Sequence, residues 1–201
     1  MSSSEPNAAR PSVGRRFFIA LVGLALILGA GAAYVAIRAG AGPPPSLIGG
    51  PFKLEGPDGK VVTDADMKGE PFLVFFGYTH CPDICPATLA EISDVLAKMP
   101  DKPIKALFIT FDPERDTAAV MKDYVSSFDK RIIGLTGDRA AIDAVERVYR
   151  VYARKVPQEG GDYTMDHSAI VYLMDSKGRF VEAFNLDRKP EDSAKELEGY
   201  L

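Results

Sequence analysis

Apolar runs separate the polar blocks of this chain, and they indicate where the strands of a sheet lie. Residues 72–76 and 104–111 are almost continuously apolar, which is the pattern of strands buried on both faces. A shorter run at 131–135 predicts a third strand. Two hairpins are also expected, formed by 52–54 with 61–63 around the turn at Asp58-Gly59, and by 169–174 with 179–185.

Between these runs, apolar residues recur every three or four positions, which is the spacing of amphipathic helices. Helices are predicted from Pro86 to the residue before Pro100, after the cap at Asp116-Thr117, from Asp138 to Tyr152, and over residues 191–200. In the second of these helices, the residues expected to face inward are Val120, Tyr124, Val125 and Phe128. Residues 155–166 are polar and contain glycine, so a loop or a flexible hairpin is expected there.

The order of these elements predicts the fold class. Strands that alternate with helices, with a hairpin at each end, favour an α/β fold in which a mixed sheet is flanked by helices. Both cysteines lie between the first buried strand and the helix that follows it, which suggests the thioredoxin-like version of this architecture. Reactive groups in such sheets gather beyond the carboxyl ends of the strands. Cys81 and Cys85 follow one of these ends, so we expect a functional site there.

The longest apolar segment, residues 17–37, is uncharged and predicts an N-terminal transmembrane helix of roughly 30 Å, at about 1.5 Å per residue. Arg10, Arg15 and Arg16 precede it, so the positive-inside rule places residues 1–16 in the cytoplasm. A cleaved signal peptide and a twin-arginine export signal are the alternatives to an uncleaved anchor.

Residues 38–50 are rich in glycine and proline, and they are expected to link the anchor to one domain over residues 51–201. Only 16 residues precede the anchor, which is short for an added mitochondrial transit peptide. A single-pass protein of a bacterial inner membrane, with its C-terminal domain in the periplasm, is therefore favoured over one that faces the mitochondrial intermembrane space.

The composition, with 46% hydrophobic and 26% charged residues, is that of a globular domain that needs no disulfide framework. Two cysteines in 201 residues therefore point to chemistry rather than to cross-linking. Beyond residue 40, Asp and Glu outnumber Lys and Arg, and no basic cluster occurs. This charge argues against nucleic acid as a partner.

The two cysteines leave three roles open: a structural disulfide, a redox pair, or part of a metal site. A disulfide between Cys81 and Cys85 would close a loop too small to contribute much through chain entropy. Both lie near a helix N-terminus, which lowers thiol pKa values and favours thiolates, and these are nucleophiles as well as metal ligands.

His167 is expected in the loop before residues 169–174, which faces the cysteine loop in a thioredoxin-like sheet. Two thiolates and one imidazole form a soft set that suits Cu(I), whereas structural zinc needs four protein ligands.

Other polar residues near these three are weaker candidates. His80 adjoins Cys81 and is interpreted as a neighbour or weak auxiliary, because two adjacent side chains reach one metal only through an unusual turn. Packing roles are expected for Tyr78 and Met165. Three carboxylates are candidates for contacts that support the site or meet a partner: Asp83, Asp112 and Asp166.

Three segments resemble the SCO/SenC family of membrane-anchored copper proteins, in that family's order: FFGYTHCPDICP (75–86), FDPERDT (111–117) and MDHSAIVYLMDSKGRF (165–180). The resemblance implies copper handling for the assembly of cytochrome c oxidase, especially its dinuclear copper A centre. It implies cytochrome c oxidase subunit II, or its copper-site thiols, and other copper chaperones as partners. It also implies that the copper ligands are Cys81, Cys85 and His167.

The leading hypothesis is therefore a copper metallochaperone rather than an enzyme. Reduced Cys81 and Cys85 would bind Cu(I), and His167 would complete the site and permit Cu(II) as well. Oxidation of the pair to a disulfide would switch binding off. The alternative is a thiol–disulfide reductase that keeps the acceptor's copper-site cysteines reduced, with His167 tuning the thiols. A peroxidase of the peroxiredoxin type has less support, because nothing supplies the Thr/Arg surround of a peroxidatic cysteine.

Overall fold

The computed structural model describes residues 21–23, 26–31, 33–34 and 47–201, and the chain divides into two units, 1–45 and 46–201. In the first unit the described residues are helical, and the large apolar side chains among them are exposed. Parts of the predicted N-terminal tail, anchor and linker lie outside the described residues, namely 1–20, 24–25, 32 and 35–46. Within the described part of the chain, no helix is both long enough and apolar enough to cross a membrane.

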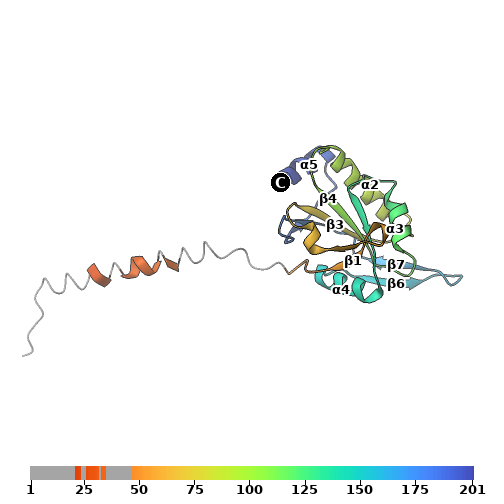
Figure 1. Cartoon of the computed structure of the whole chain (residues 1–201), viewed down its shortest axis with the longest axis horizontal. Helices are drawn as coiled ribbons and strands as arrows, with labels where there is room; N and C mark the ends of the chain where they lie inside the picture. Colours follow the sequence, from red (N-terminus) through yellow and green to blue (C-terminus); the bar gives the residue numbers. More distant parts are fainter. Residues whose placement is uncertain (1–20, 24–25, 32, 35–46) are drawn as a thin grey trace, which may run out of the picture. The chain divides into compact units, whose positions relative to one another are not determined.

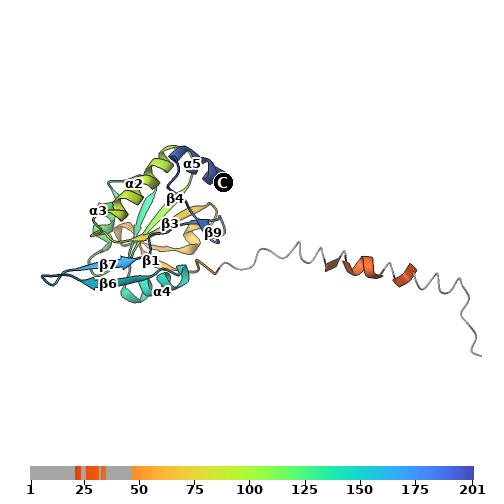
Figure 2. The same ribbon diagram turned by 180° about the vertical axis from the view of Figure 1, so that it is seen from behind.

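A five-stranded mixed sheet forms the centre of the second unit (Figures 1 and 2). Its strands, in spatial order, are β5 (Ile132–Leu135), β4 (Lys105–Thr110), β3 (Phe72–Gly77), β8 (Val171–Met174) and β9 (Phe180–Ala183). β3, β4 and β5 run parallel, whereas β8 and β9 are antiparallel to their neighbours. All of β3, and all of β4 except its first residue, is buried. The two continuous apolar runs are thus confirmed as two of the three inner strands of a mixed sheet.

Helices cover both faces of the sheet, as predicted. They are α2 (Ile84–Ala97), α3 (Ala118–Val125), α4 (Arg139–Tyr149) and α5 (Pro190–Glu198). Successive side chains of β3 point to opposite faces, so Phe75 stacks on Phe108 at 5.8 Å while Phe76 meets Tyr149 of α4 at 5.4 Å. Tyr124 of α3 stacks on Phe108 in turn. Figure 1 shows α2 and α5 together on the side of the sheet away from α4.

The inward face of α3 is the predicted one except at one position. Val125 is buried, and Tyr124 and Phe128 pack against the core as expected, but Val120 is 38% exposed and Met121 is buried instead. The cap at Thr117 is confirmed, because its side chain accepts a hydrogen bond from the Val120 backbone N–H. Met121 is buried because it lies against Gly134 of β5, where the absence of a side chain leaves room for the helix. Tyr152, expected inward, lies beyond the end of α4 and is half exposed.

Two hairpins form small sheets of their own. The first pairs β1 (Lys53–Glu55) with β2 (Val61–Thr63) around a short 3-10 turn (Pro57–Gly59), in which Asp58 and Gly59 have positive φ angles. This hairpin and its turn confirm the prediction.

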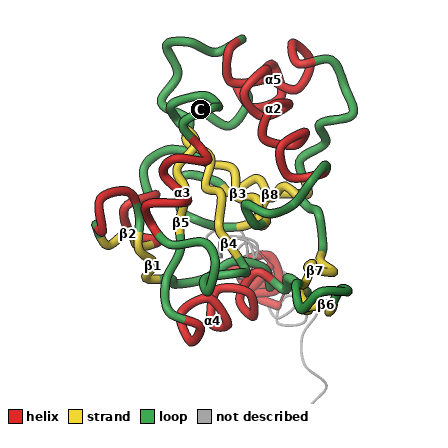
Figure 3. Tube along the Cα trace, turned by 90° about the vertical axis from the view of Figure 1, so that its right-hand side faces the viewer, coloured by secondary structure: helices red, strands yellow, loops and turns green. Residues whose placement is uncertain are grey.

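The second hairpin pairs β6 (Ala153–Pro157) with β7 (Tyr163–His167), and Figure 3 shows it set apart from the five-stranded sheet. It takes up the polar segment for which a loop or flexible hairpin was expected. His167 is therefore the last residue of a strand and not part of a loop, and β8 begins at Val171 instead of residue 169.

Candidate metal centre

A turn brings the two cysteines to the start of α2, directly beyond the carboxyl end of β3. The backbone N–H of Cys81 donates to the Tyr78 carbonyl at 3.3 Å, which closes the turn after the strand. Cys85 lies in the first turn of α2, and its backbone N–H donates to Cys81 Sγ, also at 3.3 Å. Both thiols are free and buried. The i, i+4 spacing thus turns both sulfurs toward the same side.

Gly77, the last residue of β3, makes room for this arrangement. A Cβ atom at this position would lie 2.7 Å from Cys85 Sγ and 2.5 Å from the ring of Phe108. Both distances are far below van der Waals contact, so a side chain here would displace the sulfur or the ring. The glycine before the cysteine motif therefore has a steric function.

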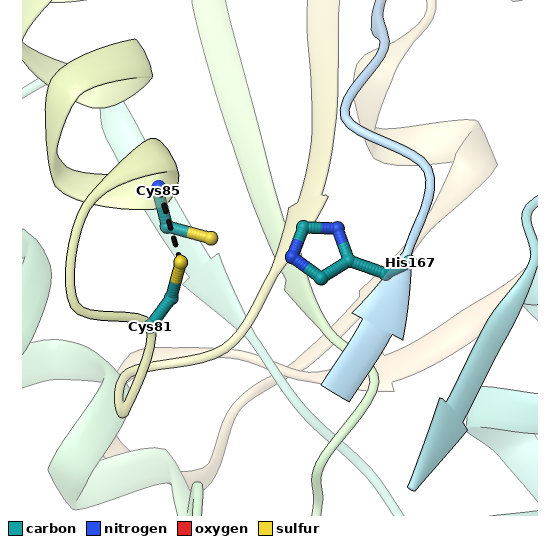
Figure 4. Close-up of side chains that lie close together, drawn as sticks. All are labelled: Cys81, Cys85 and His167. Atoms are coloured by element: carbon teal, nitrogen blue, oxygen red, sulfur yellow. Dashed lines mark hydrogen bonds between the residues drawn. The ribbon is translucent and has the colours of Figure 1, made fainter. Parts of the chain in front are cut away.

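His167 approaches the thiols from the opposite side, at the end of β7 (Figure 4). Its ring lies 4.8 Å from the ring of Phe111 and meets Tyr78 edge-on at 5.8 Å. Nδ1 lies 3.1 Å from the Ser168 carbonyl oxygen, which can only accept, so Nδ1 carries the proton. Figure 4 shows Nε2, the nitrogen left with a free lone pair, directed toward the two sulfurs.

The ligand atoms of Cys81, Cys85 and His167 all lie within 4.8 Å of one another. Three donors at this separation can converge on one metal ion. Their softness fits copper, and a fourth protein ligand for structural zinc is missing from this group. His80 is not part of it: its half-exposed ring lies beside Thr79 Oγ1 at 3.2 Å and Asp116 Oδ1 at 4.0 Å.

Burial changes the expected electrostatics of Cys85. The position near a helix N-terminus predicted a lowered thiol pKa, but burial raises the pKa of Cys85 above its ordinary value. The sulfur is fully buried, and the loss of solvation of a thiolate outweighs the attraction of the helix dipole. In the metal-free protein the Cys85 thiol is therefore protonated at neutral pH, and metal binding has to displace that proton.

A buried carboxylate that sequence reasoning treated only as a helix cap supports the cysteine loop. Asp116 is fully buried and accepts three hydrogen bonds, from the Thr79 backbone N–H at 3.0 Å, the Thr79 hydroxyl at 2.5 Å and the Thr110 hydroxyl at 2.6 Å. Thr79 lies two residues before Cys81, so Asp116 fixes the start of the turn that carries the thiols. The sequence around Asp116 does not distinguish this supporting role from helix capping, because Thr79 lies 37 residues away along the chain.

The three carboxylates singled out from the sequence lie in different surroundings. Asp112 is fully buried and accepts from the Tyr163 hydroxyl at 2.7 Å and from Arg115 Nε at 2.5 Å. Asp83 and Asp166 are exposed. Asp83 is the N-cap residue of α2, but its side chain accepts no capping hydrogen bond, and Asp166 pairs with Arg154 at 3.4 Å. Asp166 belongs to β7 itself, next to His167, and Asp112 hydrogen-bonds to β7 from the loop after β4.

Tyr78, for which only a packing role was expected, also forms hydrogen bonds to β7. Its hydroxyl lies 2.8 Å from Thr164 Oγ1 and accepts a hydrogen bond from the Met165 backbone N–H at 3.4 Å. Met165 itself is buried, as expected for a packing residue. Tyr78 thus joins the cysteine loop to β7.

The family model described as SCO1/SenC matches residues 40–201, which is most of the chain. The chain belongs to the SCO1/SenC family. The Arabidopsis thaliana mitochondrial SCO1 homolog 1 is 38% identical over 173 residues, which cover 83% of this chain and 52% of the relative. The human mitochondrial SCO1 homolog is also 38% identical, over 77% of this chain and 53% of the relative. The chain thus spans about half the length of these curated SCO1/SenC relatives.

Solved SCO1/SenC structures match the fold and include copper-bound proteins. Copper-bound ScoI of Bradyrhizobium japonicum is 58% identical, with a TM-score of 0.75, over 77% of this chain and 99% of that one. Copper-bound yeast Sco1 is 37% identical, with a TM-score of 0.71, over 78% of this chain and 88% of that one. These matches confirm the thioredoxin-like sheet. They also fit the donor set that this SCO1/SenC chain brings together.

Proposed function

We propose that this chain is a membrane-anchored copper metallochaperone that delivers copper to the copper A centre of cytochrome c oxidase during its assembly. One observation carries the proposal: two thiol sulfurs and one imidazole from separate elements converge within 4.8 Å. The copper-bound relatives of the same family support copper as the cargo.

The geometry suggests how the cargo is held and released. Cys81 and Cys85 bind Cu(I) as thiolates, with loss of their protons, and Nε2 of His167 completes the site and permits Cu(II). Copper leaves by ligand exchange with the acceptor, for which we propose cytochrome c oxidase subunit II. Oxidation of the two thiols to a disulfide releases two electrons and two protons to an oxidant such as another disulfide. It ends binding because a disulfide offers no thiolate.

The cellular setting is also part of the proposal. We place the domain in the periplasm and the apolar segment 17–37 in the inner membrane, as the positive-inside rule indicates. An anchor would keep the domain near a membrane-bound acceptor, and other copper chaperones would supply the metal.

A titration of the reduced full chain with Cu(I), in detergent and without oxygen, tests the proposal. The chain contains only two histidines, so His80→Ala is a matched control for His167→Ala. We expect the wild type and His80→Ala to bind one copper tightly, His167→Ala to bind more weakly, and the Cys81→Ser/Cys85→Ser variant to bind none. A wild type that holds no copper, or a His167→Ala variant that matches it, would contradict the proposal.

A thiol–disulfide reductase is the second candidate, and the asymmetry of the two thiols favours it. Cys81 Sγ accepts an N–H hydrogen bond, whereas Cys85 is fully buried with a raised pKa. Such a pair can attack with one sulfur and resolve with the other. The two candidates differ in His167: a reductase would still reduce an oxidised copper-site peptide after His167→Ala, while a chaperone variant would lose copper.

A further inference from the structure

The strand that carries His167 belongs to a hairpin outside the central sheet, so other contacts must fix its position. β6 and β7 pair with each other along their full length, from Ala153 opposite His167 to Pro157 opposite Tyr163. The hairpin is therefore one stiff unit of roughly 13 Å, at about 3.3 Å per residue. What holds the far end of β7 then also determines where the imidazole lies.

That far end is held by a buried carboxylate and the arginine that pairs with it. The Tyr163 hydroxyl donates to Asp112 Oδ1 at 2.7 Å, and Arg115 Nε donates to Asp112 Oδ2 at 2.5 Å. The Arg115 guanidinium lies 3.7 Å above the centre of the Tyr163 ring, and its Nη1 donates to the Tyr163 carbonyl at 3.1 Å. The ring, hydroxyl and carbonyl of Tyr163 are thus all engaged by two residues of the β4–α3 loop.

Asp112 is a rigid anchor for this contact. It is fully buried, its backbone N–H donates to Thr110 Oγ1 at 2.9 Å, and its carbonyl accepts from the backbone of Arg115 and Asp116. The residue before it, Phe111, contacts the His167 ring at the other end of β7. The same short segment therefore meets β7 at both ends.

We propose that Asp112, acting through Tyr163 and Arg115, is the positioning residue that holds His167 against the thiols. This inference rests on the proposed function and deepens it, since it separates control of the imidazole from control of the cysteines. The cysteine loop has a support of its own, the hydrogen bonds from Thr79 to Asp116, and Tyr78 also joins it to the middle of β7. Loosening the clamp of Asp112, Arg115 and Tyr163 should therefore weaken the binding that depends on histidine and leave the dithiol unchanged.

The substitution Tyr163→Phe tests this with the loss of one hydroxyl, since the ring can still stack under Arg115. Its matched control is Tyr200→Phe, which removes a tyrosine hydroxyl that donates to Glu182 at 3.3 Å away from the site. In the full chain we expect Tyr163→Phe to lower Cu(II) affinity about tenfold and to alter the electron paramagnetic resonance spectrum of bound Cu(II). Cu(I) affinity should fall by less than Cu(II) affinity, because both thiolates stay in place when the imidazole shifts. Asp112→Asn should act in the same direction.

A second readout requires no metal. The Phe111 ring, 4.8 Å from His167, shifts the imidazole proton resonances, and these can be assigned with His80→Ala. Tyr163→Phe should move the His167 resonances toward those of a free histidine, and Tyr200→Phe should not. Unchanged His167 resonances, or equal losses of Cu(I) and Cu(II) affinity, would overturn the inference. If wild type bound no copper but these resonances still moved, the copper proposal would fail while the positioning role stood.

Discussion

The substitution Gly77→Ala probes the packing beneath the metal centre with a single methyl group. Gly77 ends β3, and its carbonyl accepts a hydrogen bond from the Phe111 backbone N–H at 3.0 Å, so its backbone is fixed. The added carbon would lie 2.7 Å from Cys85 Sγ and 2.5 Å from Phe108 Cε2. Both contacts fall short of van der Waals distance by about 1 Å.

Neither neighbour can retreat freely. Phe108 is fully buried and stacks between Phe75 and Tyr124, so a shift of its ring would disturb two further aromatic contacts. Overpacking of this kind costs about 1–3 kcal/mol in the free energy of unfolding. The metal-free protein can relieve part of the strain by moving the sulfur, but a copper ion requires the sulfur in place. If copper binding forces the sulfur back and so restores about 1.4 kcal/mol of strain, copper affinity falls about tenfold.

Urea unfolding and competitive Cu(I) titration measure the two effects. Gly134→Ala in β5 is the matched control, because its added carbon would lie 3.0 Å from the Met121 carbonyl oxygen, away from the thiols. We expect both variants to be less stable, and only Gly77→Ala to lose copper affinity. The steric reasoning fails if Gly77→Ala binds copper like wild type, or if both variants lose the same affinity.

Two further predictions concern carboxylates that stabilise the fold. Asp116→Asn leaves one acceptor oxygen for three donors, so the free energy of unfolding should fall by about 1–3 kcal/mol, and an unshifted urea midpoint would contradict this. Hydrogen bonding to Arg131 lowers the pKa of Asp129, so this contact stabilises the fold above about pH 4 and its contribution is lost as pH falls through the lowered pKa. The stability deficit of Asp129→Asn should therefore shrink between about pH 7 and pH 3; a constant deficit would rule out linkage to that carboxylate.

The inner strands and the three candidate ligands could be predicted from the sequence for definite physical reasons. A strand buried on both faces has to be apolar at every position, so 72–76 and 104–111 were recognisable without knowledge of their neighbours. The four-residue spacing of the cysteines and their place after a buried strand are visible in the sequence. That His167 lies close to them was expected from the thioredoxin-like topology. These features depend on local pattern or on the order of elements.

The polar hairpin and the support of the cysteine loop depend on distant contacts instead. β6 and β7 form a sheet of their own in which all residues but Met165 are partly or fully exposed, so polar residues are tolerated at most positions and the apolar signal is weak. Asp116 looks like a helix cap in sequence, and only the fold brings Thr79 to it. The raised pKa of Cys85 likewise reflects burial that the helix position alone does not reveal.

These distant contacts converge on the segment that follows β4. The parallel strands β3 and β4 end at the same pair of residues, Gly77 and Thr110, so the loops that follow them lie at the same edge of the sheet. Asp112 then engages the hairpin of His167, while Asp116 engages the loop of the cysteines. The Asp116 backbone N–H donates to the Asp112 carbonyl at 2.9 Å, so the two carboxylates are fixed relative to each other. One short loop, together with the direct link from Tyr78 to β7, therefore sets the separation between the thiols and the imidazole, although the loop contributes no candidate ligand of its own.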